Sequence, residues 1–174
     1  MRNLSAEFLR HALGREPTAD EADAMASAHL ADWQTCVRCL PGLEAMLADL
    51  NARYRLAVVS NTADTGMVPA HLDTMGVRRY FDAVVLSAET GWRKPHPGIF
   101  AAALRELGIG PHAAVFVGDS YRADYLGPTA MGITSFLIDP GHVTGAPDHA
   151  RLASVFGLPS ALASQNKIKV RKQH

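Results

Sequence analysis

The chain has 174 residues, of which 48% are hydrophobic and 20% charged, as is typical of a globular protein. No run of 18 apolar residues occurs, so the sequence excludes a transmembrane helix by hydropathy and we expect no membrane partner. Basic and acidic residues number 17 each, but a basic cluster occupies residues 165–174. The remaining body is acidic and lacks the basic stripe of a nucleic-acid-binding surface, so we expect no nucleic-acid partner.

The N-terminal part of the chain predicts helices. Residues 1–14 are amphipathic and lack the apolar block and cleavage site of a signal peptide, so we expect a cytoplasmic protein. A second helix should begin after Thr18, because Thr18 and Glu21 form a capping-box pattern. Cys36 and Cys39 form a Cys-x-x-Cys pair that follows this helix instead of a strand and lacks two further ligands. We interpret the pair as reduced thiols, not as a redox or zinc site.

From residue 41 onward, short β-branched runs alternate with amphipathic segments. The runs predict strands at 55–60, 83–87, 113–119 and 133–139, and the other segments predict helices at 43–53, 67–76, 97–108 and 123–132. Residues 148–163 are expected to add a short edge strand and a terminal helix. This alternation is typical of an α/β fold in which a parallel sheet is buried on both faces. Ligands of such folds bind beyond the carboxyl ends of the strands.

The first candidate site residues lie at the end of the strand at 55–60 and just before the helix at 97–108. Ser60 and Asn61 end the strand at 55–60, where a hydroxyl and free backbone N–H groups can bind an anion or, alternatively, cap a helix. Lys94 lies just before the helix at 97–108, where the helix dipole disfavours a cation unless an anion lies nearby. The alternative for Lys94 is a solvated position on the surface.

Two carboxylates form the second group of candidates. Asp119 and Asp124 follow the apolar run 115–117 across a strand-to-helix turn that begins with Gly118. Carboxylates at this spacing can converge on one cation, and hard oxygen ligands favour Mg²⁺. Alternatively, Asp119 caps the helix and Asp124 is a surface acid in its first turn.

The order and spacing of these stretches resemble the haloacid dehalogenase-like (HAD) hydrolase superfamily. The resemblance is carried by VVSNT at 58–62, GVRRYFDAVVLSAETGWRKPHPGIFAAALRELG at 76–108 and VFVGDSYRADYLGPTAMGI at 115–133. It implies a Rossmann-like parallel sheet with a partial N-terminal helical cap. The acidic third stretch is similar to the Mg²⁺-dependent phosphatase branch of the family and not to its metal-free 2-haloacid dehalogenases.

The resemblance also implies a role for each candidate residue. Ser60 and the backbone of Asn61 would bind the oxygens of a phosphoryl group, and Lys94 would neutralise its charge. Asp119 and Asp124 would hold Mg²⁺. The substrate would be a small phosphorylated molecule, and Mg²⁺ the cofactor.

One part of the family pattern is missing from this sequence. The Asp-x-Asp-x-Thr/Val motif, which ends a central first strand and supplies the nucleophile, is absent. No aspartyl-phosphate can form without it, so we expect the chain alone to be inactive, as a truncated form of a longer hydrolase. Alternatively, another chain donates the strand, or the strands that end in Ser60 and Asp119 close up into a different, inactive fold. We divide the chain into a partial cap at 1–40, an α/β core at 41–164 and a disordered basic tail at 165–174.

Two other functions stay open from the sequence. A non-catalytic module would hold phosphate or Mg²⁺ weakly, or would bind a partner or a second copy through unpaired sheet edges. A metal-free 2-haloacid dehalogenase would release halide without Mg²⁺. Trp92 and His96 lie near Lys94 and are candidates for the entrance of the site, with local packing as their alternative role.

Overall fold

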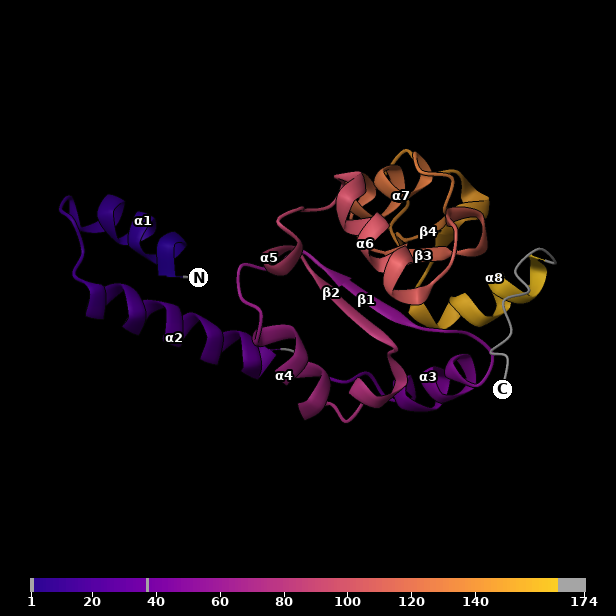
Figure 1. The fold of residues 1–174 in the computed structure, drawn as a ribbon, viewed down its shortest axis with the longest axis horizontal. Helices are drawn as coiled ribbons and strands as arrows, with labels where there is room; N and C mark the ends of the chain where they lie inside the picture. The colour runs from indigo at the N-terminus through magenta and orange to yellow at the C-terminus, as the bar shows by residue number, and fades with distance from the viewer. Residues whose placement is uncertain (1, 37, 166–174) are drawn as a thin grey trace.

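The computed structural model describes residues 2–36 and 38–165. Helices α1 (Arg2–Leu13) and α2 (Ala19–Cys36) pack against each other as an antiparallel hairpin. The hairpin projects from a larger body that contains the strands (Figure 1). The helices predicted for the N-terminal part of the chain are therefore confirmed.

The capping box near the N-terminus and the basic tail were both predicted from the sequence. The capping box is confirmed, because the Glu21 N–H donates to Thr18 Oγ1 at 3.2 Å and the Thr18 N–H donates to Glu21 Oε2 at 2.8 Å. The predicted basic tail lies outside the described residues, except for Gln165. Within the described ranges, no helix combines the length and hydropathy needed to cross a bilayer.

The body alternates helices and strands in the predicted order. Its strands are β1 (Ala57–Ser60), β2 (Ala83–Leu86), β3 (Val115–Gly118), β4 (Thr134–Ile138) and β5 (Arg151–Leu152). Its α-helices are α3 (Leu43–Asn51), α4 (Met67–Thr74), α5 (Ser87–Thr90), α6 (Pro97–Leu107), α7 (Gly127–Thr129) and α8 (Leu158–Ser164). A π-helix, η3 (Tyr121–Leu126), precedes α7, and 3-10 turns occur at Arg78–Tyr80, Pro111–Ala113, Asp148–Ala150 and Val155–Gly157. The edge strand and terminal helix expected within 148–163 are β5 and α8.

Among the described residues, all strand pairs are parallel and the strands form two separate sheets. β1 pairs with β2 along its whole length, and β4 pairs with β3 on one side and β5 on the other. β1 and β3, which end in Ser60 and Gly118, do not pair with each other. The α/β fold with parallel strands is therefore confirmed, whereas the alternative in which these two strands close up is wrong.

Helices, not strand pairing, hold the two sheets together. Phe100 of α6 packs in one apolar cluster with Val85 of β2, and Val59 and Phe116 lie against the same cluster. On α3, Leu50 packs in a second cluster with Phe136 of β4. The sheets are thus bridged by α6 and α3 across the space between β1 and β3.

The strands that flank this space are more exposed than their outer partners. All four residues of β1 and all four of β3 are half-buried, whereas β2 and β4 each contain three fully buried residues. The central strands of a continuous parallel sheet are buried on both faces and paired at both edges. Because β1 and β3 are only half-buried, each of them is an edge strand of its own sheet.

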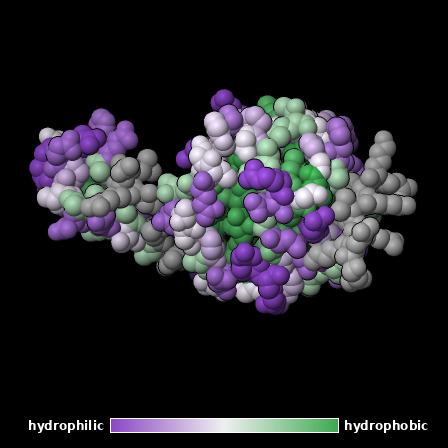
Figure 2. Space-filling model, viewed as in Figure 1, coloured by the Kyte–Doolittle hydropathy of each residue, from purple (hydrophilic) through white to green (hydrophobic). Residues whose placement is uncertain are grey.

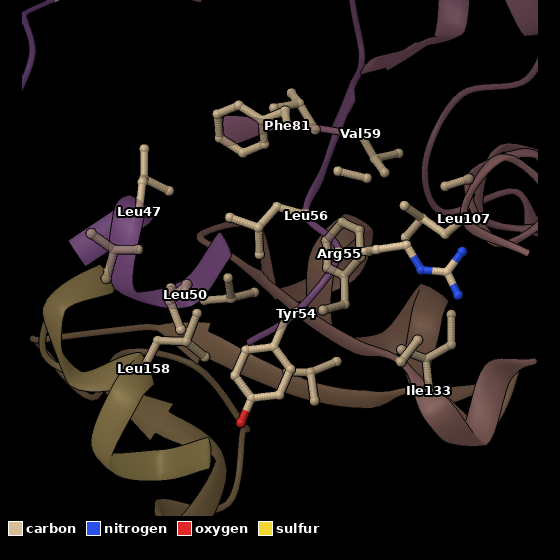
Figure 3. A pocket seen from close by; sticks show the side chains of 18 of the residues that line it. Leu47, Leu50, Tyr54, Arg55, Leu56, Val59, Phe81, Leu107, Ile133 and Leu158 are labelled. Carbon is tan, nitrogen blue, oxygen red and sulfur yellow. The ribbon is translucent and has the colours of Figure 1, made fainter. Parts of the chain in front are cut away.

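A cavity of about 440 Å³ lies between β1 and β3. Apolar side chains from both strands and from α3 and α6 line it, and Figure 3 shows Leu47, Leu50, Val59, Leu107 and Ile133 around it. Hydrophobic side chains also reach the surface on the face of the body shown in Figure 2.

Candidate active site

The loop that follows β1 is fixed by a side chain from the neighbouring strand. The Ser87 hydroxyl accepts a hydrogen bond from the Thr62 N–H at 2.9 Å and donates to the Thr62 carbonyl at 2.8 Å, and both residues are buried. Ser60, the last residue of β1, is half-buried. The helix-cap alternative for Ser60 is wrong, because α4 begins at Met67 and Asp64 Oδ1 accepts the N–H groups at its start.

Asn61 joins the end of β1 to Lys94. Its Nδ2 donates to the Lys94 carbonyl at 3.0 Å, and the Lys94 N–H donates to Asn61 Oδ1 at 2.7 Å. These two bonds, which we call the Asn61 clasp, fix the backbone of Lys94 beside the tip of β1. From the sequence we expected only the backbone of Asn61 to act, by binding phosphoryl oxygens. Its side-chain role was missed because the partner is 33 residues away and no local pattern identifies it.

Lys94 holds its ammonium group within the body. The side chain is 13% exposed, and Nζ lies 2.7 Å from Asp124 Oδ1. Nζ also lies 5.5 Å from the ring centre of Phe116, at a distance where a cation is attracted to an aromatic face. The alternative of a solvated surface lysine is therefore wrong. Asp124 is an anion of the kind that the helix-dipole argument required near Lys94.

Asp124 is buried, with 4% of its surface exposed, so its alternative reading as a surface acid is wrong. Its Oδ2 accepts the Ser120 N–H at 3.0 Å. Its Oδ1 lies 2.7 Å from Lys94 Nζ, so the ion pair neutralises the charge of this buried carboxylate. No other group of the described chain donates a hydrogen bond to Oδ1. Because a carboxylate has about four lone-pair sites, Oδ1 can contact a second cation beside its ion-pair partner.

Gly118 allows the Asp124 carboxylate to pack on the end of β3. A Cβ atom at position 118 would lie 2.5 Å from Asp124 Cγ, closer than such atoms approach in proteins. The chain then enters the π-helix η3, where the Ser120 hydroxyl caps the helix by accepting the Ala123 N–H at 3.3 Å. Because Ser120 is the cap, the alternative role of Asp119 as the cap is wrong.

Two further carboxylates follow strands at this edge of the body. Asp119 comes directly after β3, is exposed, and forms no hydrogen bond or ion pair with the described residues. Asp139 follows β4, accepts the Thr144 hydroxyl at 2.7 Å and lies 3.4 Å from Arg151 Nε. The hydrogen bond from Thr144 holds the pKa of Asp139 below its usual value. Asp139 is thus engaged by its own loop, whereas Asp119 is free to bind a ligand.

The carboxylates of Asp119 and Asp124 fit a hard divalent cation. Within the described residues, Asp124 Oδ1 has Lys94 as its only partner, and Asp119 offers an exposed carboxylate at the end of the same strand. The described part of the chain contains no group of three or more acidic, His or Cys side chains that could hold a metal. Mg²⁺ keeps several waters and tolerates such a small set of protein ligands, whereas a Zn²⁺ site needs three or four.

Trp92 and His96 pack on each other beside the site. Their rings stack at 3.9 Å with an interplanar angle of 6°. His96 Nδ1 accepts the Gly98 N–H at 3.1 Å, and a Cβ at position 98 would lie 2.5 Å from the Trp92 ring. Local packing at the start of α6 therefore accounts for both side chains.

The structure brings three of the five predicted site residues into direct contact: Asn61, Lys94 and Asp124. Ser60 is the last residue of β1, and Asp119 directly follows β3. Neither forms a hydrogen bond or ion pair with the other three among the described residues. The sequence indicated Gly118 only as the start of a turn, although a glycine between a strand and an acid is also a usable signal for close packing. No local signal indicated that the Phe116 ring would lie near Lys94. The arrangement can neutralise an anion, but no acidic side chain of the described chain lines the space between β1 and β3.

Comparisons with known proteins identify the family of this chain. Residues 6–138 match the family model described as haloacid dehalogenase-like hydrolase. Human haloacid dehalogenase-like hydrolase domain-containing protein 3 is 41% identical over 111 residues, which are 63% of this chain and 42% of that protein. Glyceraldehyde 3-phosphate phosphatase of Methanothermobacter thermautotrophicus is 36% identical over 114 residues, 65% of this chain and 50% of that one.

The fold is also found among solved structures. The crystal structure of a 2-haloacid dehalogenase from Pseudomonas syringae superposes with a TM-score of 0.72 at 26% sequence identity. The superposition covers 94% of this chain and 71% of that one. This chain spans about half the length of the curated relatives described above.

Proposed function

Because this chain belongs to the haloacid dehalogenase-like hydrolase family, we propose that its strand-end cluster binds Mg²⁺ and the phosphoryl group of a small phosphate ester, as part of a phosphatase. The strand-end cluster comprises Ser60, Asn61, Lys94, Asp119 and Asp124. The buried ion pair of Lys94 and Asp124 carries the proposal, because no other group of the described chain donates a hydrogen bond to Asp124 Oδ1. A buried ion pair contributes little net stability, so its position beyond the strand ends favours a role in binding.

The donors of the cluster are placed to bind a phosphoryl group. The Ser60 hydroxyl and the Asn61 N–H lie where β1 ends, and groups of this kind bind anions at strand ends. Lys94 is held by the Asn61 clasp, so its ammonium group needs little reorganisation to neutralise the charge on a transferring phosphoryl group. Lys94 thus has two anionic neighbours in the loaded site, the Asp124 carboxylate and the phosphoryl group.

The acids of the cluster are proposed to hold the cation. Asp124 would bind Mg²⁺ through Oδ1, and Asp119 through its exposed carboxylate. When bound, Mg²⁺ supplies positive charge that stabilises the phosphoryl oxygens during transfer. The phosphatase name of the Methanothermobacter relative, which shares 36% identity with this chain, supports a small phosphorylated substrate.

Turnover needs one more group. Hydrolysis through an aspartyl-phosphate requires a carboxylate that attacks phosphorus while the ester oxygen leaves. No acid of the described chain lines the space between β1 and β3. We therefore propose that this chain alone binds Mg²⁺ and phosphate without turning over a phosphate ester.

Inorganic phosphate and Mg²⁺ are the probes that test this binding. We expect each of them to raise the melting temperature, because a ligand that binds only the folded state stabilises it. Lys94→Met should abolish the shift with phosphate, and Asp124→Asn should abolish the shift with Mg²⁺. Arg79→Met, which removes an exposed ion pair with Glu44, is the control and should keep both shifts. Unchanged shifts in the two site variants would refute the proposal.

Halide release from a 2-haloacid is the second candidate. It is favoured by one observation, the name of the Pseudomonas syringae protein that shares this fold at 26% identity. The acidic pair Asp119 and Asp124 argues against it, because a metal-free reaction needs no pair of carboxylates to hold a cation. Chloride release from 2-chloropropionate in the absence of Mg²⁺ would favour the dehalogenase, and no release is expected.

A further inference from the structure

We propose that the loop between β4 and β5 is a pH-sensitive latch, which is closed while His142 is neutral and opens when its imidazole is protonated. We call residues 139–150 the β4–β5 loop. The latch depends on a contact between His142 and Arg151, the first residue of β5. It does not rest on the proposed function, because neither residue belongs to the strand-end cluster.

A buried carboxylate holds the β4–β5 loop closed. Asp139 is 4% exposed and accepts hydrogen bonds from the Val143 N–H at 3.1 Å and from the Thr144 N–H at 3.2 Å. Arg151 supplies the opposite charge, because its Nε lies 3.4 Å from Asp139 Oδ2, and its Nη2 donates to the Thr144 carbonyl. The loop is therefore closed by one buried ion pair and by the backbone groups that contact it.

The contact with Arg151 fixes the protonation state of His142. Arg151 Nη1 lies 2.9 Å from His142 Nδ1. A guanidinium group carries only donors and does not lose its proton in proteins, so Arg151 donates and Nδ1 accepts. His142 is then neutral, with its proton on Nε2. A protonated imidazole carries a donor on both nitrogens, so its Nδ1–H would face a guanidinium N–H and the contact would break.

The backbone of His142 is strained while the latch is closed. Its φ of 53° lies in the left-handed region, and no other non-glycine residue of the described ranges has a positive φ. This conformation is uncommon for a residue with a Cβ and persists where surrounding contacts hold it. The His142 N–H donates to the Asp139 carbonyl at 3.2 Å, and Arg151 holds the ring. Loss of the contact with Arg151 therefore favours opening of the loop.

The charged groups that face His142 come from the end of β4, from the 3-10 turn at Asp148–Ala150 and from β5. Asp148 Oδ1 lies 3.7 Å from His142 Nδ1 and would attract a protonated ring, but its side chain is 89% exposed, so solvent screens the attraction. Asp139, at the end of β4, is already paired with Arg151. Protonation of His142 thus adds a second cation beside Arg151 without a buried partner. Falling pH opens the loop, and rising pH closes it.

The β4–β5 loop also packs on the helix that carries Asp124. A Cβ atom at position 145 would lie 3.1 Å from Tyr121 Oη, so the end of the Tyr121 side chain lies against the loop backbone at Gly145. Tyr121 begins η3, in which Asp124 lies. Opening of the latch removes this neighbour of Tyr121. We therefore expect the ring signals of Tyr121 to change together with the loop.

NMR spectroscopy of the full chain tests the latch between about pH 8 and about pH 5, the range in which histidine side chains change charge. Long-range proton–nitrogen spectra should show the Nε2–H tautomer of His142 at the upper pH. Protection factors of the Val143 and Thr144 amides, corrected for the intrinsic effect of pH on exchange, should fall by about tenfold at the lower pH, as for the loss of one hydrogen bond to a charged group. The Asp139 amide, which donates to the Leu152 carbonyl in β5, should stay protected.

Two variants separate the latch from a general effect of pH. His142→Gln keeps an acceptor for Arg151 but takes up no proton, so both amides should stay protected at the lower pH. His149→Gln replaces an exposed histidine of the same loop and should lose protection as the unmodified chain does.

Three results would overturn the proposal. They are equal protection at both pH values in the unmodified chain, the same pH-dependent loss in His142→Gln, and an Nδ1–H tautomer of His142 at the upper pH. If the loop of His142→Gln is open at both pH values, the tautomer of His142 and the Tyr121 signals in the unmodified chain decide the question. Because all of these spectra are recorded without Mg²⁺ and phosphate, failure of the latch and failure of the proposed function give different results.

Discussion

Replacing Lys94 with Met leaves a buried carboxylate without its cation. The Lys94 and Asp124 side chains are 13% and 5% exposed, and their closest charged atoms are 2.7 Å apart. Removing one partner of a buried pair typically costs about 3–5 kcal/mol, whereas removing a partner from an exposed pair costs about 0–1 kcal/mol. Because both side chains are largely buried, this ion pair belongs with the buried pairs. We therefore expect Lys94→Met to lower the free energy of unfolding by about 3 kcal/mol.

Urea unfolding followed by circular dichroism measures this loss. The double variant Lys94→Met/Asp124→Asn removes the buried charge and should recover part of the stability, because no unpaired ion remains. Arg79→Met is the control: the side chains of Arg79 and Glu44 are 59% and 58% exposed, so the loss should stay below about 1 kcal/mol. A loss for Lys94→Met as small as that of the control, or no recovery in the double variant, would refute the reasoning.

Two other features of this edge of the body can be tested in the same way. Gly118→Ala places a Cβ 2.5 Å from Asp124 Cγ, so it should lower the free energy of unfolding by about 1–3 kcal/mol. It should also abolish the rise in melting temperature with Mg²⁺. Gly110→Ala is the control and should keep that rise, because nothing lies within 4 Å of its new Cβ. The pKa of Asp139 is lowered, first by the Thr144 hydroxyl, so its stabilising contribution is present above about pH 4, the pKa of an unfolded Asp, and is lost as the pH falls through the folded value. Unfolding measured from about pH 6 to pH 2 should therefore show a smaller loss for Asp139→Asn than for the unmodified chain, and equal losses would contradict this role.

The strand ends were predictable because their signals are local. The β-branched runs at 55–60 and 113–119 contain β1 and β3, and the polar residues that end them lie at one edge of the body. The position of Lys94 before a helix indicated a nearby anion, and the structure provides Asp124. The Asn61 clasp could not be predicted, because it joins segments that are 33 residues apart.

The arrangement of the sheets depended on long-range packing. The alternation of strands and helices predicts parallel neighbours but does not say whether β1 and β3 pair across a missing strand. In the structure, α3 and α6 bridge the two sheets and keep these strands apart, which leaves the cavity between them. Both strands are consequently half-buried, although their apolar sequences are typical of strands buried on both faces.

Hydrolysis of p-nitrophenyl phosphate by this chain in the presence of Mg²⁺ tests the central claim most directly. In our proposal the strand-end cluster binds Mg²⁺ and phosphate, but none of the described residues that line the cavity between β1 and β3 is an acid that could attack phosphorus. We expect phosphate and Mg²⁺ to raise the melting temperature of the same sample while p-nitrophenolate forms no faster than in buffer. Turnover well above the buffer rate that vanishes in Asp119→Asn would contradict the account.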